Sequence, residues 1–170
     1  IADIAVEHDL YIFSDEAYER IVYDNAKHVS IGSFNGMKDY VVSLFSLSKS
    51  YAMCGYRLGY CVGPDDLIAA MTKAHTYTTL STPTISQFLA IKALSLPHKY
   101  TDKMVREYKR RRNLIVKRLN EIGLATPLPQ GAFYAFSNIE DFSKNSRKFS
   151  SLLLNKAKVA VVPGTEFGSC

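Results

Sequence analysis

A chain of 170 residues that is 47% hydrophobic and 22% charged has the composition of a folded globular protein, and this excludes an intrinsically disordered one. The formal net charge of +5 would suit an anionic partner, but apart from 109–112 the basic residues are spread along the chain, so no nucleic-acid partner is expected. The sequence has no uninterrupted apolar stretch long enough to span a bilayer, and no membrane partner is expected.

The three cysteines, Cys54, Cys61 and Cys170, indicate the redox setting. An odd number without Cys-x-x-Cys spacing favours neither a disulfide framework nor a zinc site. The four histidines have no metal-ligand spacing, and we interpret them as surface or helix-end residues. A reducing, cytoplasmic setting without a bound metal is therefore expected.

The first predicted element is a helix with Ile1, Ile4 and Ala5 on one stripe and no capping residue before it, as if the chain were cut from a longer one. Two short apolar runs follow, at 10–13 and 41–45. Both are apolar on both faces, which suits strands of a parallel sheet covered by helices.

Polar residues follow both predicted strands at once. The first strand ends in Ser14-Asp15-Glu16, and the second ends in Ser46-Leu47-Ser48-Lys49. In open α/β sheets ligands bind beyond the carboxyl ends of the strands. We therefore expect Asp15 and Lys49 to face one crevice.

The remaining chain is first helical and then mixed. We predict a third strand and then three helices, the last with Gly123 as its C-cap, over 58–62, 65–77, 84–96 and 98–122. Beyond Gly123 we predict short strands over 131–136 and 159–162 around a helix over 147–158. The basic run 109–112 is interpreted as a solvated face of the long helix. A domain boundary is placed near Pro97, so the fold class is α/β over 1–97, followed by a smaller α+β domain over 98–170.

Lys49 stands in an odd place for a solvating charge, directly after an apolar run and before the Gly-x-Arg-x-Gly cluster of 55–59. A lysine amine forms a Schiff base with a carbonyl if it loses its proton near neutral pH, which desolvation or a nearby charge such as Arg57 favours. Arg57 also offers a planar fork of donors suited to phosphate, and Ser46 and Ser48 add hydroxyl donors. This set indicates a phosphorylated aldehyde cofactor, with Asp15 as the carboxylate that keeps the ring nitrogen of pyridoxal phosphate protonated.

Each of these residues also has a simpler interpretation. A lone lysine is usually a surface charge, and an arginine after a glycine often pairs with an acid. Asp15 and Glu16 can instead cap a helix over 17–21. From the residues alone, both interpretations stay open.

Four segments together favour the chemical interpretation. They are Ser14-Asp15-Glu16-Ala17-Tyr18, Ser46-Leu47-Ser48-Lys49 with Gly55-Tyr56-Arg57-Leu58-Gly59-Tyr60, Gly131-Ala132-Phe133-Tyr134, and Val162-Pro163-Gly164-Thr165-x-Phe167-Gly168. In this order they resemble the class I/II aminotransferases of the aspartate aminotransferase type, which depend on pyridoxal phosphate. The likeness covers nearly the whole chain, and Tyr56 stands where the family commonly has tryptophan, which keeps an aromatic ring.

The resemblance implies a role for each candidate residue. Lys49 would form the Schiff base with the cofactor and carry a proton to and from the substrate α-carbon. Asp15 would bind the pyridine nitrogen, and Tyr18 would hydrogen-bond the phenolic oxygen. The phosphate would be held by three side chains near Lys49, the last of them the weakest candidate: Ser46, Arg57 and Ser48.

The resemblance also implies a function, the movement of an amino group between an amino acid and a 2-oxo acid, in a full-length protein that is a homodimer. Residues 1–97 would form part of the cofactor-binding large domain with its mostly parallel sheet, and 98–170 part of the small C-terminal domain. In the family, an N-terminal half adds cofactor contacts, and an arginine after the Pro-Gly-x-x-Phe-Gly segment binds the substrate carboxylate. Both are expected outside this chain, so the chain alone is expected to be inactive.

Two other functions stay open. A carbon-sulfur lyase can use the same scaffold, because the shared motifs bind cofactor rather than substrate, and product analysis with and without a keto-acid acceptor separates it. A sensing domain of a transcription regulator can bind the cofactor without turnover. A winged-helix segment upstream of Ile1 would indicate the regulator.

Overall fold

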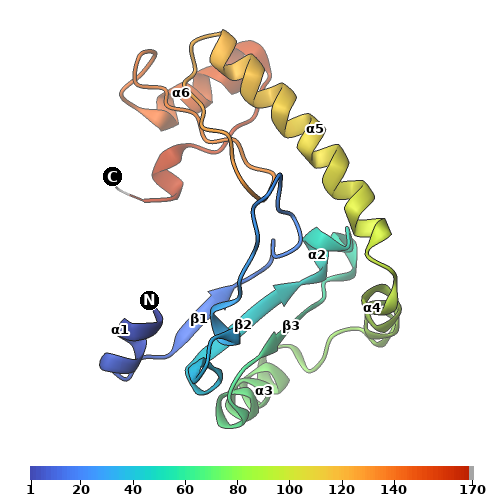
Figure 1. The fold of residues 1–170 in the computed structure, drawn as a ribbon. Helices are drawn as coiled ribbons and strands as arrows, with labels where there is room; N and C mark the ends of the chain where they lie inside the picture. Colours follow the sequence, from blue (N-terminus) through green and yellow to red (C-terminus); the bar gives the residue numbers. More distant parts are fainter. Residues whose placement is uncertain (169–170) are drawn as a thin grey trace. The chain divides into compact units, whose positions relative to one another are not determined.

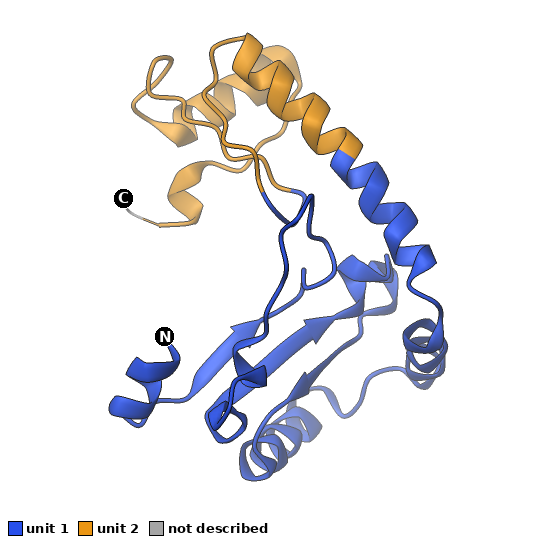
Figure 2. Cartoon of the chain, in the orientation of Figure 1, with its two compact units in different colours: residues 1–109, 130–133 blue, residues 110–129, 134–170 orange. Residues whose placement is uncertain are grey.

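The computed structural model describes residues 1–168, and the chain divides into two compact units (Figure 2). Unit 1 comprises residues 1–109 and 130–133. Unit 2 comprises residues 110–129 and the chain from Tyr134 onward. The domain boundary near Pro97 was predicted for the full-length protein, and it stays a prediction.

The centre of unit 1 is a sheet of three strands, β1 (Ile12–Asp15), β2 (Val41–Ser46) and β3 (Gly59–Val62), in that order (Figure 1). All three predicted strands are therefore confirmed, although the first begins two residues later than expected. Strands β1 and β2 are parallel, as predicted, with Asp15 opposite Leu44.

The sheet is mixed because β3 runs antiparallel to β2, with Ser46 opposite Gly59. Residues 47–58 connect these strands, and they hold the four-residue helix α2 (Leu47–Ser50) and the 3-10 turn η3 (Cys54–Tyr56). A connection of this length is at the lower limit for a parallel crossover, which usually includes a helix that runs back along the whole strand. A helix of four residues rises only about 6 Å, so the chain returns antiparallel instead.

The helices of unit 1 follow the sequence prediction closely. They are α1 (Ala2–Glu7), α3 (Asp65–Thr79), α4 (Thr84–Ser95) and the first part of α5 (Lys99–Glu121), with the 3-10 turns η1 (Ile31–Ser33) and η2 (Met37–Asp39) between β1 and β2. On the predicted stripe of α1 only Ala5 is buried, where it packs with Met37 and Val41. A second core cluster joins the α2 segment to α4 through Leu47 and Ala90.

Unit 2 contains the end of α5, then α6 (Ser146–Leu152), a π-helical turn η4 (Leu153–Ala157) and the 3-10 turn η5 (Gly164–Glu166). The helix predicted over 147–158 is thus present as α6 with η4. The two strands predicted beyond Gly123 are wrong, since no residue from 134 to 168 lies in a strand. A β-prone stretch becomes a strand only when a neighbour pairs with its backbone groups, and in the first of these stretches pairing stops at an isolated bridge between Gly131 and Val22.

The basic run of α5 is not a uniformly solvated face. Arg112 is only 6% exposed, and its Nη1 donates a hydrogen bond of 2.9 Å to the carbonyl of Pro129. Lys109 forms an ion pair of 2.7 Å with Asp24. The prediction overlooked that a long arginine stem can pack inside while its guanidinium satisfies a buried carbonyl. Among residues 1–168, no helix combines the length and apolarity that crossing a membrane requires.

Candidate active site

Three segments of unit 1 meet at one end of the sheet, where β1 and β2 finish and β3 begins. Asp15 ends β1, Ser46 ends β2, and Arg57 lies two residues before the start of β3. The register joins them, because Asp15 pairs with Leu44 and Ser46 pairs with Gly59. The topology thus brings the end of β1, where Asp15 stands, and the start of α2, which carries Lys49, to the same end of the sheet. That Asp15 and Lys49 face one crevice stays a prediction.

Lys49 lies in α2, which begins directly after β2. Ser46 is the N-cap of this helix, and its Oγ accepts a hydrogen bond of 3.2 Å from the Ser48 amide. Leu47 is buried and donates its amide to the carbonyl of Leu58 at 3.2 Å, which ties α2 to the segment after Arg57. These contacts fix the backbone from which the lysine side chain projects.

Two aromatic rings flank the Lys49 ammonium. Its Nζ is 5.6 Å from the ring centroid of Tyr18 and 5.6 Å from that of Phe133, within the range of cation–π attraction. The two rings contact each other edge to face, with centroids 5.1 Å apart. Tyr18 and Lys49, which the sequence predicted to share a site, are thus brought together.

Phe133 was quoted in a motif but not assigned to the site. It reaches Lys49 because residues 130–133 pair with 21–23: Tyr23 donates its amide to Gln130 at 2.9 Å and its hydroxyl to the carbonyl of Ala132. The ring also lies 5.3 Å from that of Tyr108. The Gly-Ala-Phe-Tyr motif was the signal for this residue, but sequence spacing could not place it beside a lysine so distant in the chain.

Asp15 and Arg57 make only local contacts. The exposed Asp15 accepts the Ala17 amide on Oδ1 at 3.2 Å, but residues 17–20 form a turn rather than the helix that was considered. Arg57 closes η3 in the left-handed conformation, with φ 52° and ψ 51°, and its Nη1 donates to the carbonyl of Cys54 at 2.9 Å. Asp15 Oδ2 and the remaining guanidinium N–H groups of Arg57 are the atoms of these two side chains that can bind a ligand.

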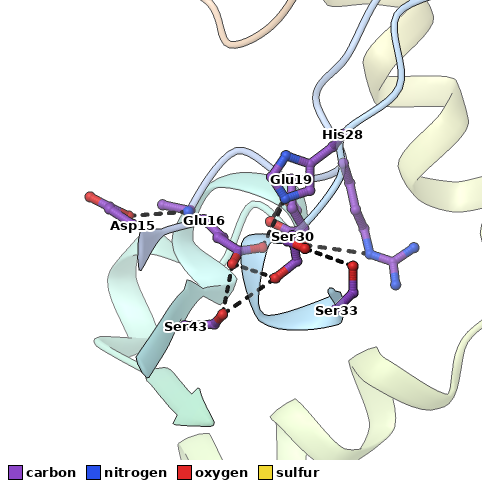
Figure 3. Close-up of polar contacts among 10 residues, drawn as sticks. Asp15, Glu16, Glu19, His28, Ser30, Ser33 and Ser43 are labelled. Atoms are coloured by element: carbon purple, nitrogen blue, oxygen red, sulfur yellow. Dashed lines mark hydrogen bonds and ion pairs between the residues drawn. The ribbon is translucent and has the colours of Figure 1, made fainter. Parts of the chain in front are cut away.

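Glu16 lies beside these residues and was not predicted as part of the site. It is 3% exposed and accepts hydrogen bonds from His28 Nε2 at 2.8 Å, Ser30 Oγ at 2.7 Å and Ser43 Oγ at 2.7 Å (Figure 3). Burial alone raises the pKa of this carboxyl, but the hydrogen bonds around it outweigh burial and leave its pKa below the ordinary value. His28 is exposed, as a surface histidine is expected to be, and it also hydrogen-bonds this buried group.

Glu19, in the same turn, is tied to α2. It accepts a hydrogen bond from Ser50 Oγ at 3.2 Å, next to Lys49, and it lies 3.6 Å from Arg20 Nε. Burial raises the pKa of the Glu19 carboxyl more than its hydrogen bonds and neighbouring charges lower it. The turn that carries Asp15 and Tyr18 is thus held by a carboxylate at each end.

The sequence profile described as aminotransferase class I and II matches residues 1–169. The chain belongs to the class I and II aminotransferases. Members of this family depend on pyridoxal phosphate. The family resemblance inferred from the four motifs is confirmed.

Among class I and II aminotransferases, the chain is 48% identical to an aspartate aminotransferase of Pyrococcus abyssi, over 99% of this chain and 44% of that protein. It is 46% identical to aromatic-amino-acid aminotransferase 2 of Thermococcus litoralis, with the same coverage of 99% and 44%. The crystal structure of the aromatic aminotransferase from Pyrococcus horikoshii OT3 matches it with a TM-score of 0.94 at 46% identity, covering 99% of this chain and 46% of that one. The chain therefore spans less than half the length of these relatives.

Proposed function

We propose that the protein containing this chain is a pyridoxal-phosphate-dependent aminotransferase that moves an amino group between an amino acid and a 2-oxo acid. The observation that supports this most directly is the surroundings of Lys49, whose Nζ lies 5.6 Å from two aromatic rings, beside the sheet edge that holds Asp15, Ser46 and Arg57. Pyridoxal phosphate, when bound, supplies an aldehyde that captures amines and a ring that draws electrons from the substrate α-carbon.

The residues present fit this cofactor by the chemistry of their donors. A lysine, a carboxylate and an anion-binding pair stand at one edge, and these match an aldehyde, a pyridinium and a phosphate. We assign Lys49 Nζ to holding the aldehyde carbon and to moving a proton at the substrate α-carbon. The Asp15 carboxylate would accept a hydrogen bond from the protonated ring nitrogen, and its negative charge would keep that nitrogen protonated.

The remaining assignments concern orientation of the cofactor. The Tyr18 hydroxyl is assigned to the phenolic oxygen, and the phosphate to Ser46 and Arg57, with Ser48 as the weaker candidate. Ser46 Oγ already accepts the Ser48 amide at 3.2 Å, so its hydroxyl proton can be donated to a phosphate oxygen. These side chains would hold the cofactor at both its ring and its phosphate.

At the level of the whole protein, we assign residues 1–97 to a cofactor-binding large domain and 98–170 to a small C-terminal domain. The protein is proposed to act in the cytoplasm as a homodimer. Its substrates are an amino acid and a 2-oxo acid, and no nucleic acid takes part. The relatives described above are named as aminotransferases of aspartate and of aromatic amino acids, which favours the aminotransferase over the lyase and the regulator.

The experiment uses the longest natural protein that contains these residues, with added pyridoxal phosphate and a panel of amino acids. The expected result is that a new amino acid forms only when a 2-oxo acid acceptor is present. Lys49→Ala should abolish its formation, whereas Lys73→Ala, which removes an exposed lysine of α3, should not. Release of ammonia without an acceptor would instead identify a lyase.

A further inference from the structure

Asp15 and Glu16 are neighbours at the end of β1, and their side chains leave the chain on opposite sides. Figure 3 shows the Asp15 carboxylate apart from the group formed by Glu16, Ser30 and Ser43. Asp15 is exposed, whereas Glu16 is buried. Whatever immobilises the Glu16 side chain therefore also fixes the backbone from which Asp15 projects.

Glu16 is immobilised by donors from two other segments. Ser43 lies on β2 and donates to Glu16 Oε1 at 2.7 Å, and the Glu16 amide donates to the β2 carbonyl of Leu44 at 2.9 Å. Ser30, in the loop before η1, donates to the same oxygen at 2.7 Å. His28 lies 2.8 Å from the other oxygen. A buried carboxylate with this many donors is costly to rotate, because any other position leaves polar groups unpaired.

The far end of the turn is tied to the helix that carries Lys49. Glu19 accepts a hydrogen bond from Ser50, and its amide donates to the carbonyl of Glu16 at 3.1 Å. Tyr18 lies between these two carboxylates, and its ring contacts Phe133 and the Lys49 ammonium. Glu16 and Glu19 thus anchor the turn on both sides of Tyr18.

We propose that Glu16 is a positioning residue: its buried carboxylate ties the turn from Asp15 to Tyr18 onto β2 and so holds both side chains in register with Lys49. This inference rests on the proposed function for its kinetic consequence only. The geometric part concerns the chain's own residues and holds with or without a cofactor. Glu16 touches no reacting group and acts through Asp15 and Tyr18.

The first test measures amide hydrogen exchange in the longest natural protein that contains the chain, without cofactor. Two variants weaken the anchor: Glu16→Gln removes its charge, and the milder Ser43→Ala removes one donor. Both should speed exchange in the peptide covering 14–20 by about tenfold or more. The matched control is Thr126→Val, which removes an equally buried hydroxyl from a polar cluster in unit 2 and should leave that peptide unchanged.

The second test is kinetic and uses the protein loaded with pyridoxal phosphate. We expect Glu16→Gln to lower kcat by about tenfold or more with little change in KM, because misplaced groups affect the reacting geometry more than substrate capture. The double variant with Asp15→Asn should be no slower than Asp15→Asn alone, since Glu16 acts through that carboxylate. A loss of stability alone would instead lower activity in proportion to the folded fraction, as in Thr126→Val.

The outcomes separate the two proposals. Unchanged exchange over 14–20 in both anchor variants overturns the positioning role, whatever the enzyme does. Additive losses of kcat in the double variant also overturn it. Turnover that survives Lys49→Ala overturns the proposed function, and the exchange experiment still decides the role of Glu16.

Discussion

Lys49 is the residue whose covalent chemistry can be tested without knowing the substrate. If the protein is mixed with pyridoxal phosphate and reduced with borohydride, peptide mapping should find the cofactor on Lys49 Nζ. The reason is local: hydroxyl and guanidinium donors for the phosphate stand at the same sheet edge as this amine. Lys49→Arg should remove the label and Lys73→Arg should keep it, and a label on another lysine would contradict the assignment.

Asp15 offers a separate prediction. Replacing one oxygen of its carboxylate by an amide nitrogen removes the charge and keeps a hydrogen-bond acceptor, so the two effects can be separated. Asp15→Asn retains an oxygen for the Ala17 amide but loses the negative charge that we propose faces the ring nitrogen. We expect kcat to fall by about 10²–10³, equivalent to about 3–4 kcal/mol, while cofactor affinity changes far less. Titration of the cofactor and steady-state kinetics measure the two effects. Near-normal turnover would mean that the carboxylate serves only the local turn.

Glu16 should also leave a signature in the pH dependence of stability. Its carboxyl has a pKa below the ordinary 4.5 in the folded protein, because hydrogen bonds outweigh burial. Its contribution to the free energy of unfolding is therefore fully present above pH 4.5 and is lost as the pH falls through the folded pKa. Urea unfolding from pH 3 to 7 should show the free energies of unfolding of wild type and Glu16→Gln converging toward the acid end.

Glu19 provides the opposite sign in the same experiment. Burial holds its pKa above 4.5, so its contribution is fully present below that pH and declines as the pH rises through the folded pKa. The difference in the free energy of unfolding between wild type and Glu19→Gln should therefore be largest at low pH and should shrink as the pH rises. Parallel curves for both variants would show that neither carboxyl is perturbed by folding.

At the scale of elements, the pairing of β2 with β3 depends on the absence of a side chain at Gly59. A Cβ there would lie 2.6 Å from the carbonyl oxygen of Phe45, and backbone at that distance has to move. Gly59→Ala should destabilise the protein by about 1–3 kcal/mol, measured by urea unfolding. Gly55→Ala is the matched control in the same motif, because nothing lies within 4 Å of its Cβ and it should cost less. Equal effects would contradict this account.

Elements were predictable where the signal is local. The starts of α3 at Asp65 and of α4 at Thr84 were predicted from nearby aspartates and proline. The predicted cap of α3 by Asp65 or Asp66 is wrong, because Pro64 is the N-cap and makes no side-chain cap hydrogen bond. The antiparallel direction of β3 was not predicted, because direction depends on how the connection packs. The burial of Arg112 escaped prediction because its partner is a carbonyl of a distant loop, at Pro129. Long-range pairing also explains why the predicted strands beyond Gly123 failed.

The same distinction applies to the candidate site. Asp15 ends one strand and Lys49 closely follows the next, so the topology rule predicted that these two face one crevice. Arg57 was predicted from its short sequence distance to Lys49. Phe133 and Glu16 were missed for a different reason. Their importance comes from contacts made across the fold, with Lys49 and with His28, and nothing in their immediate sequence encodes those contacts.

At the scale of the whole molecule, the exposed apolar face of α4 predicts how this chain behaves by itself. Ile85, Phe88 and Ile91 share one face of the helix and are 65%, 67% and 67% exposed. We expect the 170-residue chain, expressed alone, to self-associate and to lack transaminase activity. Light scattering should show less association after Phe88→Lys with Ile91→Lys. A monomeric, active chain would contradict both expectations.

The division into units has a consequence for the order in which the site is completed on the ribosome. Unit 1 is interrupted by residues 110–129, and Phe133 follows Lys49 by 84 positions. At ordinary rates of synthesis, the lysine therefore emerges about 4–17 seconds before the second of its two rings. During that interval Tyr23 also lacks residues 130–132, whose carbonyls accept its hydrogen bonds. A nascent chain arrested anywhere before Phe133 would therefore present the lysine with only one of its two flanking rings.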